Sequence, residues 1–379
     1  MRSTPASRVR RAETGSRVDA TVKEGPPRAN AVARWRAGLF ASPMASVITL
    51  GLAAVLLWAA WHLVEWAVLG AVGVPDYPSC KAAHGACWGF VVEKWRLILF
   101  GRYPYEAQWR PALATAAVLA MLVASALPAL WSRRAVQALA VGWMVAFALF
   151  FALMFGGVLG LAPVGTDRWG GLPLTVILTL VGITASTPVG IALALARRSS
   201  LPLLRSLATA YIELVRGVPL ITVLFVATFV FPLVLPAGWR LDPFWRVVIG
   251  LVLFQAAYMA ETVRGGLQSV SRAQHEAATS LGLRYWQVQR AVILPQALVA
   301  VIPAFVNNLL STFMDTSLVT VVSMYDLTGS LRLALGDPRW RDFFIEGYLF
   351  IAAIYFAGSF AMSRYSLWLE RRLRIGNAH

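Results

Sequence analysis

Charged residues are scarce in this sequence. They make up 14% of its 379 residues, whereas hydrophobic residues make up 58%. A soluble domain carries about a quarter charged residues, so the composition argues against a soluble globular protein. Several apolar runs reach the roughly 20 residues that a helix needs to cross a bilayer. Because lipid cannot satisfy the open edge of a strand, the sequence predicts an all-α integral membrane protein.

Lysine, histidine and cysteine are also rare. The only lysines are Lys23, Lys81 and Lys94, and none follows a glycine. A phosphate-binding P-loop needs a Gly-Lys-Ser/Thr sequence, so an ATPase of that kind is excluded from this chain. The histidines are scattered, and neither a Ser-His-Asp set nor a metal-ligand spacing stands out. We therefore expect no catalytic site, metal or cofactor in this chain.

The two cysteines, Cys80 and Cys87, lie close together in a polar loop. If this loop is outside the cytoplasm, a disulfide bond between them is possible. A metal site is less favoured, because only His84 lies near them.

Apolar runs indicate eight transmembrane spans. They cover approximately residues 48–72, 112–131, 135–155, 172–196, 217–236, 246–263, 299–322 and 343–362. An even number of spans places both termini on the same side of the membrane. Lysine and arginine are concentrated in the segments that share that side, which predicts that both termini are cytoplasmic. Most of the net charge of +16 is then a topology signal, and we expect no nucleic-acid partner.

The chain divides at about residue 170. Residues 1–40 are polar, rich in arginine and expected to be a disordered cytoplasmic tail. Residues 41–170 form a three-span extension with a periplasmic loop at 73–110. Residues 171–379 form a five-span core with a cytoplasmic loop at 265–298. No internal repeat is apparent, so an inverted-repeat carrier gains no support.

The cytoplasmic loop contains the most water-compatible stretch of the second half, "HEAATSLGLRYWQVQRAVILPQ", residues 275–296. We expect a first helix that ends near Gly282, because glycine is unfavourable inside helices and common just after them. A second helix should cover 284–292, and Pro295 should bend the chain as it returns to the bilayer. By itself, this pattern fits an amphipathic connector as well as a docking element.

The spacing of this loop resembles the EAA loop of ABC importer permeases. The matching residues are Glu276, Ala277, Ala278, Gly282, Val292, Leu294 and Pro295, with Val292 in place of the usual isoleucine. In that family the loop docks into a groove of the ATPase subunit. The resemblance implies a coupling role for Glu276, Ala277, Ala278, Gly282, Leu294 and Pro295, and we call residues 265–298 the coupling loop. We expect the small side chains of Ala277 and Ala278 to let a partner approach this surface closely.

Other stretches narrow the resemblance. "YIELVRGVPLITVLF" (211–225), "AAYMAETVRGGLQSV" (256–270) and "MDTSLVTVVSMYDL" (314–327) are similar to the polar amino-acid uptake permeases. The three-span extension and "GACWGF…FGRYPYE" (85–106) resemble one long subunit of the general L-amino-acid transporter. The family usually has threonine where this chain has Val218, and a basic-Gly pair where it has Arg272-Ala273.

The resemblance implies a multi-pass permease subunit in the bacterial inner membrane that imports L-amino acids. The expected partners are ABC ATPase subunits that bind ATP and Mg, a second, related permease, a periplasmic amino-acid-binding protein and membrane lipid. Two alternatives are a secondary amino-acid carrier and a membrane-embedded transferase that uses Asp315 or Glu261. Neither alternative accounts for the coupling loop.

Polar residues within the spans are candidates for the substrate path, because buried charge in a membrane is costly. Asn308, Thr312 and Asp315 share one helical face, which could meet the ammonium group of an amino acid or could join helices. A second face, on the predicted span 246–263, carries Tyr258 and Glu261.

Arg264 continues this second face. Glu261 and Arg264 either pair with each other or recognise the charged groups of a substrate. Glu213 and Arg216 repeat the same spacing, and we expect them to form a gate or a structural pair.

Overall fold

The computed structural model describes residues 38–158, 160–236, 238 and 241–376. Almost all of the tail expected at residues 1–40 lies outside these ranges. The chain forms two compact units, residues 1–66 and residues 67–379, which we call the first and the main unit. Each unit is described separately.

The described part of the first unit is dominated by helix α2 (Pro43–Val64), which is followed by a π-helical turn η1 (Glu65–Leu69). The side chain of Ser42 caps α2 by accepting a hydrogen bond from the backbone N–H of Ala45 at 3.1 Å. No residue of α2 is buried, although the helix is strongly apolar. An apolar surface all round a helix of 22 residues is suited to contact with lipid.

The main unit is almost entirely helical. Its α-helices are α3 (Tyr77–Ala82), α4 (Gly89–Phe100), α5 (Trp109–Ala126), α6 (Arg133–Phe155), α7 (Gly171–Arg197), α8 (Pro202–Arg216), α9 (Leu220–Phe225), α10 (Pro243–Ser269), α11 (Arg272–Ser280), α12 (Tyr285–Val288), α13 (Leu294–Asp315), α14 (Leu327–Ala334) and α15 (Phe344–Gly376). Short 3₁₀ or π segments are η2 (Tyr105–Ala107), η3 (Pro128–Leu130), η4 (Thr166–Arg168), η5 (Val226–Val230), η6 (Phe231–Val234), η7 (Gln289–Ile293), η8 (Thr316–Val322) and η9 (Arg341–Phe343).

A two-residue strand, β1 (Tyr325–Asp326), forms isolated parallel bridges to Gly170 and Gly171. Gly171 has a positive φ of 64°, and a side chain there would collide with the backbone of Leu99. Glycine therefore allows the start of α7 to pack directly against the end of α4.

Six described helices are long and apolar enough to cross a membrane, or up to eight spans if each of two bent helix pairs counts as one. The all-α membrane fold predicted from the sequence is confirmed. The predicted fifth span, 217–236, contains the short helix α9 and the segments η5 and η6, which together cover 220–234. A bend of 104° before α9 separates this segment from α8. Pro219 precedes α9 in an extended conformation, and a proline disfavours helical backbone in the residue before it.

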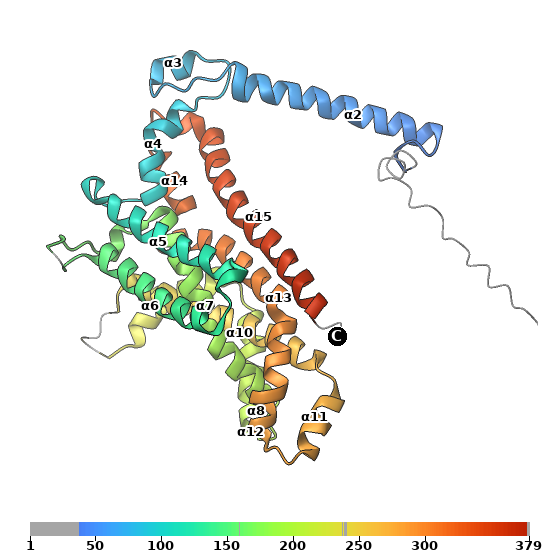
Figure 1. Ribbon diagram of the computed structural model, residues 1–379. Helices are drawn as coiled ribbons and strands as arrows, with labels where there is room; N and C mark the ends of the chain where they lie inside the picture. The colour runs from blue at the N-terminus through green and yellow to red at the C-terminus, as the bar shows by residue number, and fades with distance from the viewer. Residues whose placement is uncertain (1–37, 159, 237, 239–240, 377–379) are drawn as a thin grey trace, which may run out of the picture. The chain divides into compact units, whose positions relative to one another are not determined.

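Helices α7, α10 and α13 lie side by side in the middle of the main unit (Figure 1). The largest buried cluster packs around the fully buried Trp169, which contacts the rings of Phe155 and Phe244. Phe151 of α6 joins the same cluster. These aromatic contacts attach the extension, through α6, to the residue that precedes α7 and to the start of α10.

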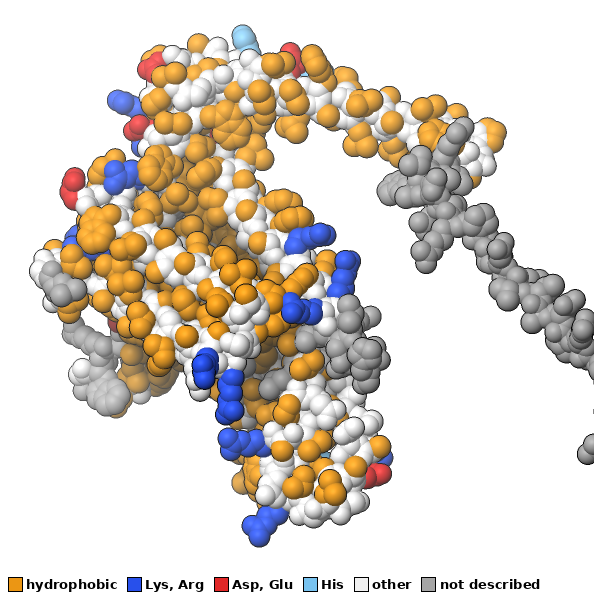
Figure 2. All heavy atoms as spheres, in the orientation of Figure 1, with side chains coloured by type: hydrophobic (Ala, Val, Ile, Leu, Met, Phe, Trp, Pro, Cys, Tyr) orange, Lys and Arg blue, Asp and Glu red, His pale blue; other side chains and the backbone are white. Residues whose placement is uncertain are grey.

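The main unit has two distinct ends. Helices α3, α4 and α14 lie at one end, and α8, α11 and α12 lie at the other (Figure 1). The surface of the main unit that is visible in Figure 2 is largely hydrophobic between these ends. At the end that carries α11, and beside the C-terminal part of α15, the charged side chains in view are mostly Lys and Arg.

Candidate functional site

The coupling loop is built around a sharp turn at Gly282, whose φ is 78°. The N–H of Gly282 donates to the carbonyl of Thr279 at 2.9 Å, and the N–H of Leu283 donates to the carbonyl of Ala278 at 3.4 Å. This pair of bonds is the Schellman arrangement, which satisfies the last carbonyls of a helix and requires a left-handed residue. The predicted end of the first helix at Gly282 therefore has a local cause.

The second helix of the loop starts immediately after the turn. The backbone N–H of Arg284 donates to Oε1 of Gln287 at 2.9 Å, which satisfies a donor at the start of α12. The helix then continues through the π segment η7 into α13, with Pro295 in the first turn of α13.

Large apolar side chains are exposed around the turn. Leu281 is 81% exposed and Trp286 is 68% exposed, and Tyr285 beside them is also exposed. Glu276 and Ala277 lie on the surface of α11. Glu276 has no side-chain hydrogen bond or ion pair within the described part of the chain. This surface therefore offers both apolar area and one free carboxylate.

One member of the EAA motif is placed differently from the prediction. Ala278 is only 3% exposed and packs inside the chain with Val288 and Ile293. The sequence interpretation assigned both Ala277 and Ala278 to the surface that a partner approaches. That interpretation is wrong for Ala278, because the turn at Gly282 folds α12 back over it. Its small side chain instead allows the two helices of the loop to pack closely.

A cluster of charged residues joins the ends of α7, α8 and α10. Glu261 is at its centre and is 16% exposed on its side chain. Its carboxylate contacts Arg197 at 2.6 Å, Arg264 at 2.8 Å and Arg216 at 3.7 Å. Arg197 also contacts Glu213 at 2.8 Å. We call these five residues the Glu261 cluster.

The Glu261 cluster differs from the predicted pattern in one respect. Glu213 and Arg216 have the spacing of a helical pair, but they do not pair with each other. Glu213 contacts Arg197 of α7, and Arg216 turns toward Glu261 and the ring of Tyr258, 5.6 Å from its centroid. A half-buried carboxylate such as Glu261 needs several donors, and these come from neighbouring helices. Tyr258 and Glu261, which were predicted to share one helical face, thus both contact Arg216.

The polar face of α13 is mostly used for packing. Asn308 donates from Nδ2 to Oγ1 of Thr262 on α10 at 2.9 Å, and the buried Thr312 donates to the carbonyl of Asn308 at 2.8 Å. Asp315 is partly buried, and its carboxylate has no partner among the described residues. Of the three predicted residues, only Asp315 presents an unpaired charge.

Arg197 is a residue of this site that was not predicted from the sequence. It binds both glutamates of the Glu261 cluster. The available signal was its position directly after an apolar run, where an arginine can reach the carboxylate of another helix. Sequence spacing could not indicate which carboxylate.

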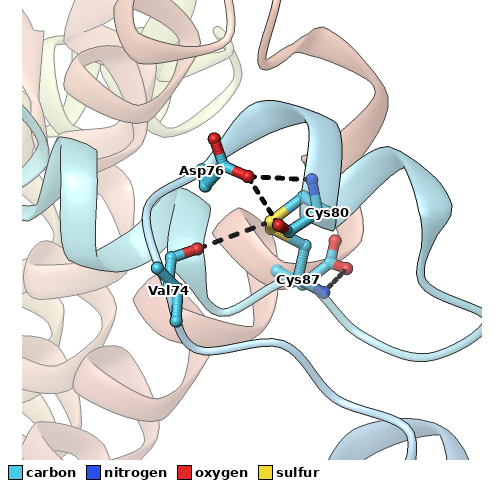
Figure 3. Close-up of a disulfide and its surroundings, with 6 residues drawn as sticks. Val74, Asp76, Cys80 and Cys87 are labelled. Atoms are coloured by element: carbon cyan, nitrogen blue, oxygen red, sulfur yellow. Dashed lines mark hydrogen bonds between the residues drawn. A yellow bond between two sulfur atoms is a disulfide. The ribbon is translucent and has the colours of Figure 1, made fainter.

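The opposite end of the main unit contains the two cysteines. Cys80 in α3 and Cys87 are joined by a disulfide bond (Figure 3). The backbone N–H of Cys87 donates to Oε1 of the buried Glu346 at 2.8 Å, which ties this segment to α15. Lys94 of α4 pairs with Asp337 at 2.8 Å. We call residues 72–100 and 325–340 the disulfide region.

Asp326 is fully buried within the disulfide region. It accepts hydrogen bonds from the N–H of Gly329 at 2.9 Å, from the hydroxyl of Tyr355 at 2.9 Å and from that of Thr320 at 3.0 Å. Burial raises the pKa of Asp326, although these donors oppose the shift. The residue caps α14 and joins it to α15, so its role is structural.

No group of three or more His, Cys, Asp or Glu residues that could hold a metal ion occurs among the described residues. The expectation that this chain binds no cofactor remains a prediction.

Comparison with known proteins identifies the family. Residues 186–375 match the family described as "Binding-protein-dependent transport system inner membrane component". The inner membrane amino-acid ABC transporter permease protein YhdY of Escherichia coli (strain K12) is 42% identical over 90% of this chain and 92% of its own length. The glutamate/glutamine/aspartate/asparagine transport system permease protein BztC of Rhodobacter capsulatus is 34% identical, over 90% of this chain and 93% of its own length. The crystal structure of an amino acid ABC transporter with histidines has 32% identity and a TM-score of 0.48, and it covers 53% of this chain and 92% of that chain.

The chain therefore belongs to the inner-membrane components of binding-protein-dependent transport systems. Within this family it is a permease subunit of an ABC importer, as the sequence resemblance implied, and ATP is hydrolysed by a separate subunit. Both relatives match the extension as well as the core.

Proposed function

We propose that this chain forms, with a related but non-identical permease, the path by which L-amino acids pass from a periplasmic binding protein to the cytoplasm. ATPase subunits that bind ATP and Mg dock on its coupling loop and drive the passage. The relatives named for amino acids, including acidic amino acids and their amides, support this substrate class. Membrane lipid surrounds the apolar surface.

The observation that carries this proposal is the combination of a fixed turn and an exposed apolar surface in the coupling loop. Leu281, Tyr285 and Trp286 surround a turn that is held by backbone hydrogen bonds. Exposed apolar area of this kind is stabilised when a partner covers it, and rigid presentation reduces the entropy lost on docking. An ATPase groove is the partner that the family supplies.

A substitution at Gly282 tests the proposal. Gly282→Val should abolish uptake, because a β-branched residue cannot readily adopt a φ of 78°, although there is open space for its side chain. Gly282→Asn is the matched control, because asparagine tolerates the left-handed conformation and should keep most of the activity. The assay is uptake and ATP hydrolysis in proteoliposomes of the complete transporter. Coupled uptake in Gly282→Val equal to wild type would refute the docking role.

The orientation is part of the proposal. Both termini and the coupling loop are assigned to the cytoplasm, supported by the basic side chains around α11 and at the end of α15 (Figure 2). A cysteine at the exposed Ser280 should react with an impermeant maleimide only after spheroplasts are permeabilised. A cysteine at the exposed Glu93 should react in intact spheroplasts. The reverse pattern would refute the orientation.

Asp315 is the proposed contact for the ammonium group of the substrate. It is the member of the α13 face that has no partner in the described chain, whereas Asn308 joins α13 to α10. Asp315→Asn should lower uptake tenfold or more while the complex still assembles, since a charge-assisted hydrogen bond is worth about 1.5–3 kcal/mol. Equal uptake by wild type and variant would show that the polar face of α13 serves only to pack helices together.

The Glu261 cluster is proposed as the cytoplasmic gate. Its ion pairs join three helices that must separate if the path opens on that side. Glu261→Gln removes the central charge and should change the uptake rate more than the apparent affinity. A change in affinity alone would instead place Glu261 in the substrate site.

The two alternative functions make different predictions. A secondary carrier would move substrate along an ion gradient without ATP, and a transferase would alter its substrate chemically. Uptake that requires ATP and delivers unmodified amino acid would exclude both.

A further inference from the structure

Arginine residues surround a cavity at the end of the main unit that carries the coupling loop. The cavity has a volume of about 560 Å³ and is lined by Arg197, Arg198, Arg264, Leu267, Gln268, Val270 and Arg272. Among the described residues, four arginines and no carboxylate line it. This volume lies within the range of about 300–1,000 Å³ that is typical of small-molecule sites.

The charges of these arginines are only partly compensated. Arg197 and Arg264 donate to Glu261, and Arg197 also donates to Glu213. Arg198 and Arg272, by contrast, make no hydrogen bond or ion pair within the described part of the chain. The cavity therefore has two unpaired guanidinium groups in addition to the Glu261 cluster. An anion that supplies several acceptor oxygens would satisfy them best.

The helix that begins at the cavity adds to this preference. Helix α11 starts at Arg272, and its N-cap, Ser271, makes no side-chain capping hydrogen bond. The free N–H groups of this first turn carry a partial positive charge, which favours an anion nearby.

The position of the cavity indicates where such an anion would come from. Helix α7 ends at Arg197 and α10 ends at Ser269, and both are candidate membrane spans. The cavity is thus at the level at which a bilayer surface would lie. Leu267 and Val270 provide an apolar part of its wall. Apolar and cationic groups together match a molecule with a phosphate group beside hydrocarbon.

We infer that this arginine cavity binds a phosphate group, held by Arg198 and Arg272, and that the headgroup of an anionic phospholipid supplies it. Inorganic phosphate has the same recognition chemistry and is the second source to be distinguished. The inference rests on the proposed orientation, because anionic headgroups must reach the end of the main unit that carries α11. A basic pocket between spans at the cytoplasmic surface is the setting in which anionic headgroups bind.

The test uses the complete purified transporter. In one arm, native mass spectrometry measures phosphatidylglycerol and phosphatidylcholine retained after each is added at equal concentration. In a second arm, inorganic phosphate is titrated calorimetrically into the transporter in phosphatidylcholine nanodiscs. The variant is Arg198→Gln combined with Arg272→Gln. The control is Arg205→Gln combined with Arg134→Gln, which removes the same charge from exposed positions that lie outside the coupling loop and do not line the cavity.

Wild type and control should retain phosphatidylglycerol in preference to phosphatidylcholine, and the cavity variant should bind it about tenfold more weakly or worse, because two charge-assisted contacts are lost. Phosphate binding without lipid selectivity, abolished in the cavity variant, would assign the site to free phosphate. No preference and no phosphate binding in wild type, or an equal loss in the control, would overturn the inference.

Two further measurements distinguish loss of the lipid site from loss of ATPase assembly and from failure of the proposed transport function. If the double variant does not assemble with the ATPase, Arg198→Gln alone is measured, because Arg198 lies outside the coupling loop. ATP-driven uptake is assayed in the same preparations. Intact uptake without phosphatidylglycerol selectivity would reject only the lipid site, and selective binding without amino-acid uptake would reject only the proposed function.

Discussion

The coupling loop and the disulfide region lie at opposite ends of the main unit and are held in different ways (Figure 1). In the disulfide region, a covalent bond, the buried Glu346 and the Lys94–Asp337 pair connect segments that are far apart in sequence. In the coupling loop, local backbone hydrogen bonds fix the turn, while Leu281 and Trp286 are largely exposed.

The comparison distinguishes groups that stabilise the fold of the chain from groups that are available to bind a partner. Buried acceptors such as Glu346 satisfy donors of the chain itself, so their loss should appear as lower stability. Exposed apolar side chains around Gly282 contribute little to the folded chain, so their loss should appear only when a partner binds. The following substitutions would break or sharpen this contrast, from the largest expected effect to the smallest.

The largest effect is expected from removing the exposed apolar surface of the coupling loop. Leu281→Ala combined with Trp286→Ala should reduce ATPase binding by about 100-fold or more, because a central tryptophan contributes about 2 kcal/mol or more to an interface and the exposed leucine adds to it. The melting temperature of the isolated chain should not change. Leu233→Ala, at an equally exposed leucine outside the loop, is the control. Lower thermal stability of the loop variant would show that these side chains support the fold.

Removal of the disulfide bond should affect stability instead. Cys80→Ser combined with Cys87→Ser should cost about 2.5 kcal/mol, because the unfolded chain regains the entropy of a short closed loop. The measurement is thermal unfolding of the purified chain with and without reductant. The melting temperature of the wild type should match that of the variant only when reductant is present. Equal thiol counts in denatured wild type with and without reductant would reject the bond.

Glu346→Ala should have a somewhat smaller effect. It leaves the buried N–H of Cys87 without its acceptor and should cost about 2 kcal/mol. Glu346→Gln keeps an amide oxygen at this position and should recover part of the loss. Thermal unfolding of both variants beside wild type tests this, and equal stability of Ala and Gln would exclude the hydrogen bond as the cause.

The smallest effect concerns the surface pair of Lys94 and Asp337. The hydrogen bond from Lys94 holds the pKa of Asp337 below its usual value of 3.8. The ionised form is therefore favoured in the folded chain, and its contribution to stability is present above pH 3.8 and is lost as the pH falls further. Asp337→Asn should melt slightly below wild type near neutral pH, and the difference should vanish in acid. A difference that persists at low pH would require another cause.

Local features of the coupling loop were predictable from sequence. Gly282 ends a helix because its left-handed backbone and the two Schellman hydrogen bonds involve only residues within five positions of each other. The membrane class follows from composition, and the approximate positions of the long spans follow from apolar runs. These features depend on each residue and its neighbours in the chain, so the sequence alone determined them.

The tertiary structure alone decided which groups meet. An i, i+3 spacing shows that Glu213 and Arg216 share a helical face, but the rotation of α8 against α7 and α10 sends each to a different partner. Glu261 contacts Arg197 across a separation of 64 residues, and Glu346 contacts Cys87 across 259. Ala278 is buried because α12 folds over it. Helical periodicity fixes the direction of a side chain relative to its own axis, whereas the neighbour in that direction depends on how all the helices pack together.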